Sequence, residues 1–269
     1  MAPNMPHQSA NDLWADAAGQ LSADDKQHIN FNQPDKLQIL VELRADAELS
    51  KQISIDKRWK FVRKSGETVV VRDVFEKIVR WVDTFKQIGD IAVQYDATHA
   101  SLPWAGIRLI LQIAVNDTQN LNLVVEGLAE IAELICRYAV TETLYNQAAS
   151  KADEGLKRAM VKLYASILGY LSKANQYLKQ GTAKRMIKSV VLTEKQLDLG
   201  LDAIRTAEKE IRPWMNLVDK DDTIRHQNTF SADRIRNHDA LVYLLQGMDV
   251  PLRRMDDRLK DLNDNLQSK

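Results

Sequence analysis

The chain has 269 residues, of which 45% are apolar and 28% charged, a mixture typical of folded proteins rather than disordered ones. Basic and acidic residues both number 37, so the formal net charge is zero and gives no general attraction toward nucleic acid. The single cysteine, Cys136, excludes an intramolecular disulfide and a cysteine-based zinc site, and we expect it to be a small core residue.

Residues 1–34 form a polar N-terminal segment that we expect to be partly flexible, with one short helix around residues 13–21. The segment lacks the apolar core of a signal peptide, so we expect a cytoplasmic protein, with peripheral membrane contact on activation as an alternative. The most apolar stretch, residues 102–115, contains Arg108 and Gln112 and is shorter than the roughly 20 residues of a membrane span. We therefore predict a buried central helix there.

Beyond this segment, apolar residues recur at spacings of three and four, which is the spacing of one face of an α-helix. Pro213 predicts a kink or an early stop near the end of one helix. Residues 67–71, ETVVV, have strand-like composition but no evident partner strand, so we predict a loop that leads into a helix. The predicted helices cover residues 36–52, 72–95, 104–115, 118–149, 154–179, 194–218 and 231–246.

These elements predict an all-α fold: an elongated multi-helix bundle over residues 35–246, followed by a heptad-patterned C-terminal helix over residues 247–269. In this last helix apolar residues alternate at spacings of three and four, as in a coiled coil. The pattern is compatible with a helix that packs on its own bundle, with a linker, or with a self-association seam. The candidate seam consists of Leu252, Met255, Leu259, Leu262 and Leu266.

The sequence contains no P-loop, no glycine-rich dinucleotide motif, no GxSxG and no HExxH. The best catalytic candidates, for a hydrolase site, are Asp96 and His99 beside Ser101. Their close spacing suits helix caps and a turn better than a converging triad. His226 and His238 have no third metal ligand beside them. We therefore predict a non-enzymatic protein with no catalytic residue, no cofactor and no metal.

Charge is distributed unevenly along the chain. Residues 155–193 contain eight basic residues and no acidic one, interleaved with an apolar helical stripe. Such a face suits anionic lipid or an acidic partner, unless neighbouring acidic helices balance it. Its candidate binding residues are Lys157, Arg158, Lys162 and Lys173.

A second basic cluster is interleaved with two aromatic residues, Trp59 and Phe61, which could stack on bases. The zero net charge nevertheless argues against nucleic acid as a partner. The cluster consists of Lys57, Arg58, Lys60, Arg63 and Lys64.

Residues 74–117 read VFEKIVRWVDTFKQIGDIAVQYDATHASLPWAGIRLILQIAVND. This stretch resembles the N-terminal domain of fungal NACHT-NTPases, the NLR-like signalling ATPases of the STAND class that often carry WD40 or ankyrin repeats. The segments DLWADAAGQL and MDDRLKDLNDNL are also similar to that family. The most characteristic residues of the resemblance are His99, Pro103, Trp104, Gly106 and Arg108.

The resemblance implies a helical signalling or effector domain whose C-terminal helix leads toward a NACHT domain. Such a domain would act by protein–protein association on oligomerisation, in fungal innate immunity, programmed cell death and heterokaryon incompatibility. Its partners would be other copies of itself or downstream signalling proteins. The alternative is a HeLo-like cell-death effector that acts on an anionic membrane through the basic face, and a third interpretation is a hydrolase with its site near Asp96 and His99.

Overall fold

The computed structural model describes residues 12–28, 36–63, 65–91, 101–114, 118–145, 151–179, 194–225 and 243. Within these ranges the chain is almost entirely helical, with a single small antiparallel sheet, which confirms the predicted all-α class. The helices are α1 (Leu13–Gly19), α2 (Ala23–Gln27), α3 (Lys36–Asp56), α4 (Val71–Ile91), α5 (Ser101–Ala114), α6 (Thr118–Tyr145), α7 (Lys151–Lys179) and α9 (Glu194–Arg225). The strands are β1 (Lys60–Val62) and β2 (Thr68–Val70).

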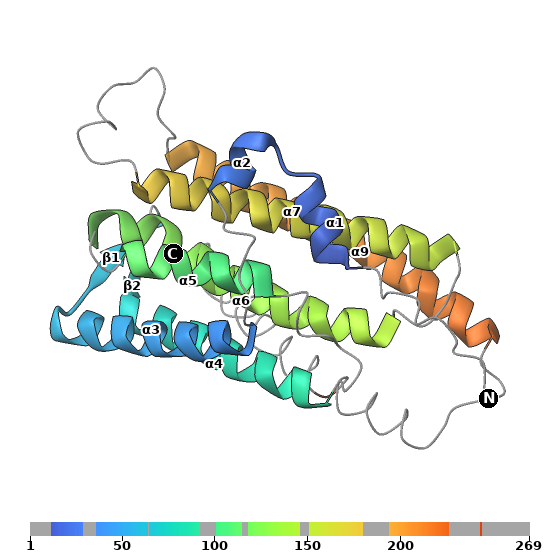
Figure 1. The fold of residues 1–269 in the computed structure, drawn as a ribbon, viewed down its shortest axis with the longest axis horizontal. Helices are drawn as coiled ribbons and strands as arrows, with labels where there is room; N and C mark the ends of the chain where they lie inside the picture. The colour runs from blue at the N-terminus through green and yellow to red at the C-terminus, as the bar shows by residue number, and fades with distance from the viewer. Residues whose placement is uncertain are drawn as a thin grey trace, which may run out of the picture.

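The six long helices stack as three layers of two (Figure 1). Helices α3 and α4 form one outer layer, α7 and α9 form the other, and α5 and α6 lie between them. Helix α5 packs on both α3 and α7, whereas α6 packs on α4 and also contacts α7 and α9. The short helices α1 and α2 lie across the outer side of α7. Among the described helices, none is long and apolar enough to cross a bilayer.

Helix α4 shows how the apolar pattern determines the packing. Its apolar residues recur at three- and four-residue spacing, and one continuous stripe of them is buried against α3 and α6. At the end of this stripe Phe85 meets Trp104 of α5 edge-on, with ring centroids 5.3 Å apart and planes at 63°. Trp104 is fully buried, so α5 is the central helix that the sequence predicts.

Glycines allow the closest approaches between helices. A Cβ atom on Gly106 of α5 would lie 2.9 Å from Leu171 of α7. A Cβ atom on Gly155 of α7 would collide with the ring of Trp214 of α9. Side chains at these two positions would therefore separate α7 from its neighbours on either side.

Helix α9 continues through Pro213 to Arg225, so of the predicted kink or early stop near Pro213 the early stop is wrong. A proline lacks the N–H that would bond the carbonyl four residues earlier, but one lost hydrogen bond does not end a helix that is held by packing. Ile211 and Val218 on either side of the proline are buried, and Trp214 packs against the core.

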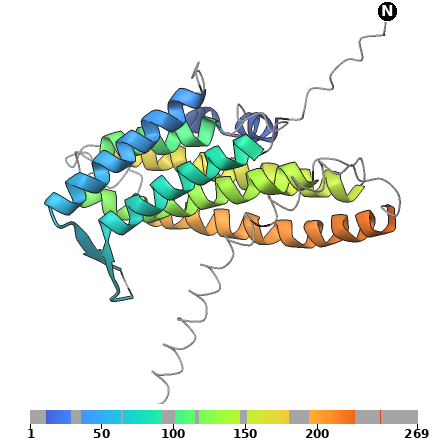
Figure 2. The ribbon, with the colours of Figure 1, turned by 90° about the horizontal axis from the view of Figure 1, so that it is seen from below.

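The predicted loop at residues 67–71 is also wrong, because residues 68–70 form β2 and pair with β1 in an antiparallel hairpin. The paired residues are Lys60 with Val70, Phe61 with Val69, and Val62 with Thr68. Gly66, at φ 88°, supplies the left-handed turn residue between the strands. Figure 2 shows the hairpin projecting from one end of the bundle.

Candidate functional site

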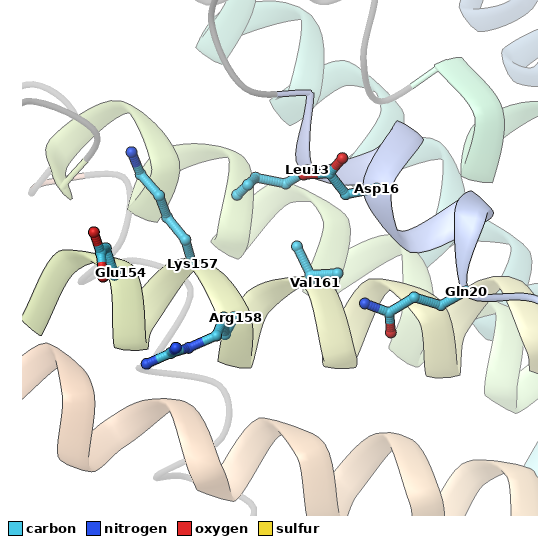
Figure 3. A pocket seen from close by; sticks show the side chains of 7 residues that line it. All are labelled: Leu13, Asp16, Gln20, Glu154, Lys157, Arg158 and Val161. Carbon is cyan, nitrogen blue, oxygen red and sulfur yellow. The ribbon is translucent and has the colours of Figure 1, made fainter. Parts of the chain in front are cut away.

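The described surface contains a groove of about 650 Å³ between α1 and α7. Its wall on one side is α1, which Asp12 caps by accepting a hydrogen bond from the backbone N–H of Ala15 at 2.9 Å. The groove collects two of the predicted basic residues, Lys157 and Arg158 (Figure 3). The remaining lining residues are Leu13, Asp16, Gln20, Glu154 and Val161.

The groove has mixed charge. Lys157 and Arg158 form no ion pair within the described part of the chain, and Figure 3 shows them leaving α7 in different directions. Asp16 and Glu154 place two carboxylates in the same lining, so the two signs balance. Such a lining suits a small polar or zwitterionic group better than a polyanion.

The other two predicted basic residues of α7 are not part of this groove. Lys162 lies on the side of α9, where its Nζ contacts both carboxylate oxygens of Glu210 at 2.7 Å. Lys173 is half-buried and lies three turns farther along α7. The structure therefore does not gather Lys157, Arg158, Lys162 and Lys173 into one free cationic face, because α9 supplies a counter-charge to Lys162 and carboxylates share the groove with Lys157 and Arg158.

Helix α1 is held on α7 by an aromatic contact that the sequence did not reveal, and the same tyrosine also bonds to α6. Trp14 stacks on Tyr164 with ring centroids 3.8 Å apart and planes at 3°, and the Tyr164 hydroxyl donates a hydrogen bond to Glu142 of α6. Burial, opposed by the hydrogen bond from Tyr164 and assisted by the nearby charge of Asp12, raises the pKa of Glu142 to about 7. The carboxyl group is thus poised to titrate near neutral pH.

Charged residues along α6 join this helix to neighbouring elements through ion pairs. Glu126 pairs with Arg63 of the hairpin, and Glu130 pairs with Arg205 of α9 at 2.9 Å. About two turns farther along α6, Arg137 bridges Glu133 of its own helix, at 2.6 Å, to Glu208 of α9, at 2.5 Å. These contacts are structural, and burial raises the pKa of Glu133.

The characteristic residues of the resemblance lie mostly in α5 and form packing contacts. Pro103 and Trp104 are buried, and Gly106 faces Leu171 of α7. Arg108 contacts Glu42 at 2.5 Å and Asp46 at 2.9 Å, both on α3. Gly106 and Arg108 therefore join α5 to α7 and to α3, respectively.

Several predicted residues lie outside the described part of the chain: His99, the catalytic candidate Asp96, Lys64, and the seam of Leu252, Met255, Leu259, Leu262 and Leu266. Cys136 is fully buried, its thiol lies 3.1 Å from the carbonyl oxygen of Trp81, and burial raises its pKa well above the ordinary value. It is the core residue that the sequence predicts. Among the described residues, no cluster of three or more histidine, cysteine or acidic side chains could hold a metal ion.

Comparison with known proteins identifies a family for this region. Residues 73–223 match a family defined as a domain of unknown function (DUF7708), and the match covers more than half of the chain. The matched region runs from the first turn of α4 to the last turn of α9 and contains the whole of α5, α6 and α7. No curated protein and no solved structure matches the chain significantly.

Proposed function

The chain belongs to the DUF7708 family, and we propose that it is a non-enzymatic helical signalling domain of a fungal NLR-like NACHT protein. The resemblance of residues 74–117 to the N-terminal domains of those proteins supports this proposal. In the proposed mechanism, oligomerisation of the NACHT portion brings several copies of this bundle together. Tethering then raises the effective concentration, so that weak contacts between bundles become sufficient for assembly.

The outer face of α3 is the observation that carries the association part of the proposal. Val41, Ala45 and Leu49 follow one another at four-residue spacing, and Val41 and Leu49 are 59% and 60% exposed. Ile55 adds another exposed apolar side chain farther along the same helix. Helix α3 thus has apolar residues on its outer side as well as on the side that faces α4 and α5. An exposed apolar face of this kind is typical of a surface that contacts another protein.

The ionisable groups support a binding role rather than catalysis. Strongly shifted pKa values mark catalytic groups when these groups converge on a pocket. Here Glu133, Cys136, Glu142 and Tyr170 have raised pKa values, but burial between helices is the main cause for each. None of the four lines the α1–α7 groove.

The proposal can be tested by fusing the chain to a chemically induced tetramerisation tag and measuring assembly by light scattering before and after induction. We expect the native chain to form assemblies larger than the tetramer only after induction. Leu49→Asp should abolish this growth if the α3 face makes the contact, and Leu259→Asp should abolish it if the C-terminal seam does.

Two variants with the same charge change serve as controls. Ala203→Asp places the charge on the exposed surface of α9, and Gln267→Asp places it at an outer heptad position of the C-terminal segment. Both should assemble like the native chain, and circular dichroism checks that every variant keeps its helical content. Unchanged assembly of both Leu49→Asp and Leu259→Asp would contradict the proposal.

A further inference from the structure

The β1–β2 hairpin has two chemically different faces. Phe61 and Val69, which are paired across the strands, point inward: Val69 is buried and Phe61 packs against the core. The flanking residues point outward because side chains alternate along a strand. The outer face therefore carries Lys60, Val62, Thr68 and Val70, all of which are exposed.

The outer face combines exposed apolar side chains with cations. Val62 is 66% exposed and Val70 is 37% exposed, and their positions in the register make them diagonal neighbours on this face. Lys57, Arg58 and Lys60 lie at the base of the hairpin and are exposed, and none of them forms an ion pair within the described ranges. The chain from residue 57 to residue 66 contains no acidic residue.

Arg63 differs from these three cations. It pairs with Glu126 of α6 and with Glu67 across the turn, so it holds the hairpin on the bundle and is not available to a partner. Among the described residues, the arrangement leaves three cations without an ion pair beside two exposed valines, on an element that projects from the end of the bundle (Figure 2).

Arg58 occupies a backbone position that normally favours glycine. Its φ is 51°, and it ends α3 in a Schellman-type motif: the N–H of Trp59 donates to the carbonyl of Ser54 at 2.9 Å and that of Arg58 to Ile55 at 3.0 Å. A side chain with a Cβ atom is strained there, since left-handed backbone disfavours L-residues other than glycine, asparagine and aspartate. The sequence thus places a cation where glycine would be the less strained residue.

We propose that this surface, Lys57, Arg58, Lys60, Val62 and Val70, binds an anionic lipid bilayer. Apolar side chains that enter the headgroup region, flanked by cations that contact anionic headgroups, are the two components of interfacial membrane binding. The inference goes beyond the proposed signalling function and uses different residues from it.

Nucleic acid fits the same surface less well. Base stacking needs an open aromatic face, but Lys57 lies over the ring of Trp59 at 5.0 Å from its centroid, and Phe61 packs into the core. Exposed valines also find no partner on a phosphate backbone, which offers charge but no apolar surface. A lipid surface uses both the valines and the cations.

The test measures sedimentation of the full chain with phosphatidylcholine vesicles, with and without phosphatidylserine, at low and high salt. We expect binding only with phosphatidylserine, and weaker binding at high salt. A hairpin variant, Lys57→Glu with Arg58→Glu and Lys60→Glu, should bind more weakly by at least about 100-fold, since loss of each basic side chain costs about fivefold and the new carboxylates repel the headgroups. The control variant, Lys195→Glu with Lys209→Glu and Arg212→Glu, makes the same charge change at exposed positions on α9 and should bind normally.

Two single substitutions separate a lipid site from a structural role or a general polyanion site. Arg58→Gly should raise the melting temperature, because it relieves the backbone strain, and yet weaken vesicle binding about fivefold. Val62→Ser should weaken vesicle binding several-fold and leave binding to heparin unchanged. A native chain that does not bind the anionic vesicles, equal losses in the hairpin and control variants, or unchanged vesicle binding of Val62→Ser would each overturn the proposal. These outcomes are independent of the assembly experiment, since no tag or induced oligomer is used.

Discussion

Helix α7 and the β1–β2 hairpin with the residues just before it contain the two basic clusters of the described chain. The two clusters differ in how far neighbouring elements cover their cations and supply carboxylates to them. Most residues of α7 are buried under α1, α2, α5 and α9, and its Lys162 pairs with Glu210 of α9. Lys157 and Arg158 form no ion pair within the described ranges, but they share a groove with two carboxylates. The hairpin has one side on the bundle and the other exposed, so Lys57, Arg58 and Lys60 keep their charges unpaired in the described structure. A basic run along the chain therefore predicts a free cationic surface only where no neighbouring element supplies counter-charges.

Among the substitutions that distinguish the packed interior from the exposed hairpin, Trp104→Ala is expected to lower the free energy of unfolding most. Trp104 is fully buried and packs edge-on against Phe85, so its truncation leaves a large cavity at the centre of the bundle. We expect a loss of about 4 kcal/mol in the free energy of unfolding, measured by urea denaturation. Val62→Ala in the hairpin should change it by less than about 0.5 kcal/mol. Similar losses in the two variants would contradict the distinction between a packed interior and an exposed hairpin.

The next effect concerns the carboxyl group of Glu142 on α6, which accepts a hydrogen bond from Tyr164, the residue on which Trp14 of α1 stacks. Its pKa rises from an ordinary value of 4.5 to about 7 in the folded chain, so the folded state holds the proton more tightly than the unfolded state. This contribution to stability is complete below pH 4.5 and is lost as the pH rises toward 7. The groups that act on Glu142 are Tyr164 of α7, through its hydrogen bond, and Asp12 before α1, through its charge.

We expect the native chain to lose about 3 kcal/mol of stability between pH 4.5 and pH 8 from this group. Glu142→Gln keeps an acceptor for the Tyr164 hydroxyl but cannot ionise, so this part of the pH dependence should disappear. Urea denaturation at several pH values, with the fluorescence of Trp14 and the other tryptophans as the signal, makes the comparison. An identical pH dependence in both proteins would show that Glu142 does not titrate in this range.

Gly155 tests how closely α7 packs on α9. An added Cβ atom collides with the ring of Trp214, and we expect Gly155→Ala to destabilise the fold by about 2 kcal/mol in spite of the better helix propensity of alanine. Gly169 provides the control on the same helix, because its nearest neighbour would be Leu21 at 4.0 Å. Gly169→Ala should stabilise the fold by up to about 1 kcal/mol, as expected for an unobstructed position in a helix. Thermal unfolding of the two variants gives the sign of each change.

The long helices could be predicted from the sequence because their apolar residues repeat over many turns. The predicted span of α7, residues 154–179, differs from the observed helix only at its first turn. The hairpin was missed because strands of three residues are too short to show alternation. The available signal was Ser65–Gly66, a turn pair between KFV and TVV.

The candidate sites were only partly predictable, for a different reason. Which cations stay free depends on residues far apart in the chain: Glu210 reaches Lys162 across 48 positions, and Glu208 reaches Arg137 across 71. Trp14, Tyr164 and Glu142 likewise come from three helices and share no sequence pattern. The basic cluster at residues 57–64 was visible in the sequence, whereas the exposed valines beside it required the register of the hairpin.

The smallest expected effect concerns the attachment of the hairpin to the bundle. Arg63 pairs with Glu126, but both side chains are about one-third exposed, so Arg63→Gln should lower the free energy of unfolding by no more than about 1 kcal/mol. The local effect should be larger than the global one, because a short hairpin has few other contacts with the bundle. Hydrogen exchange should become faster at the amides of Arg63 and Val71, which donate to Glu67 and Trp59 within the hairpin. Arg44→Gln removes a comparable pair with Asp83 between α3 and α4 and should leave these two amides unchanged. Equal exchange rates in the two variants would mean that the packing of Phe61 and Val69, rather than the ion pair, holds the hairpin in place.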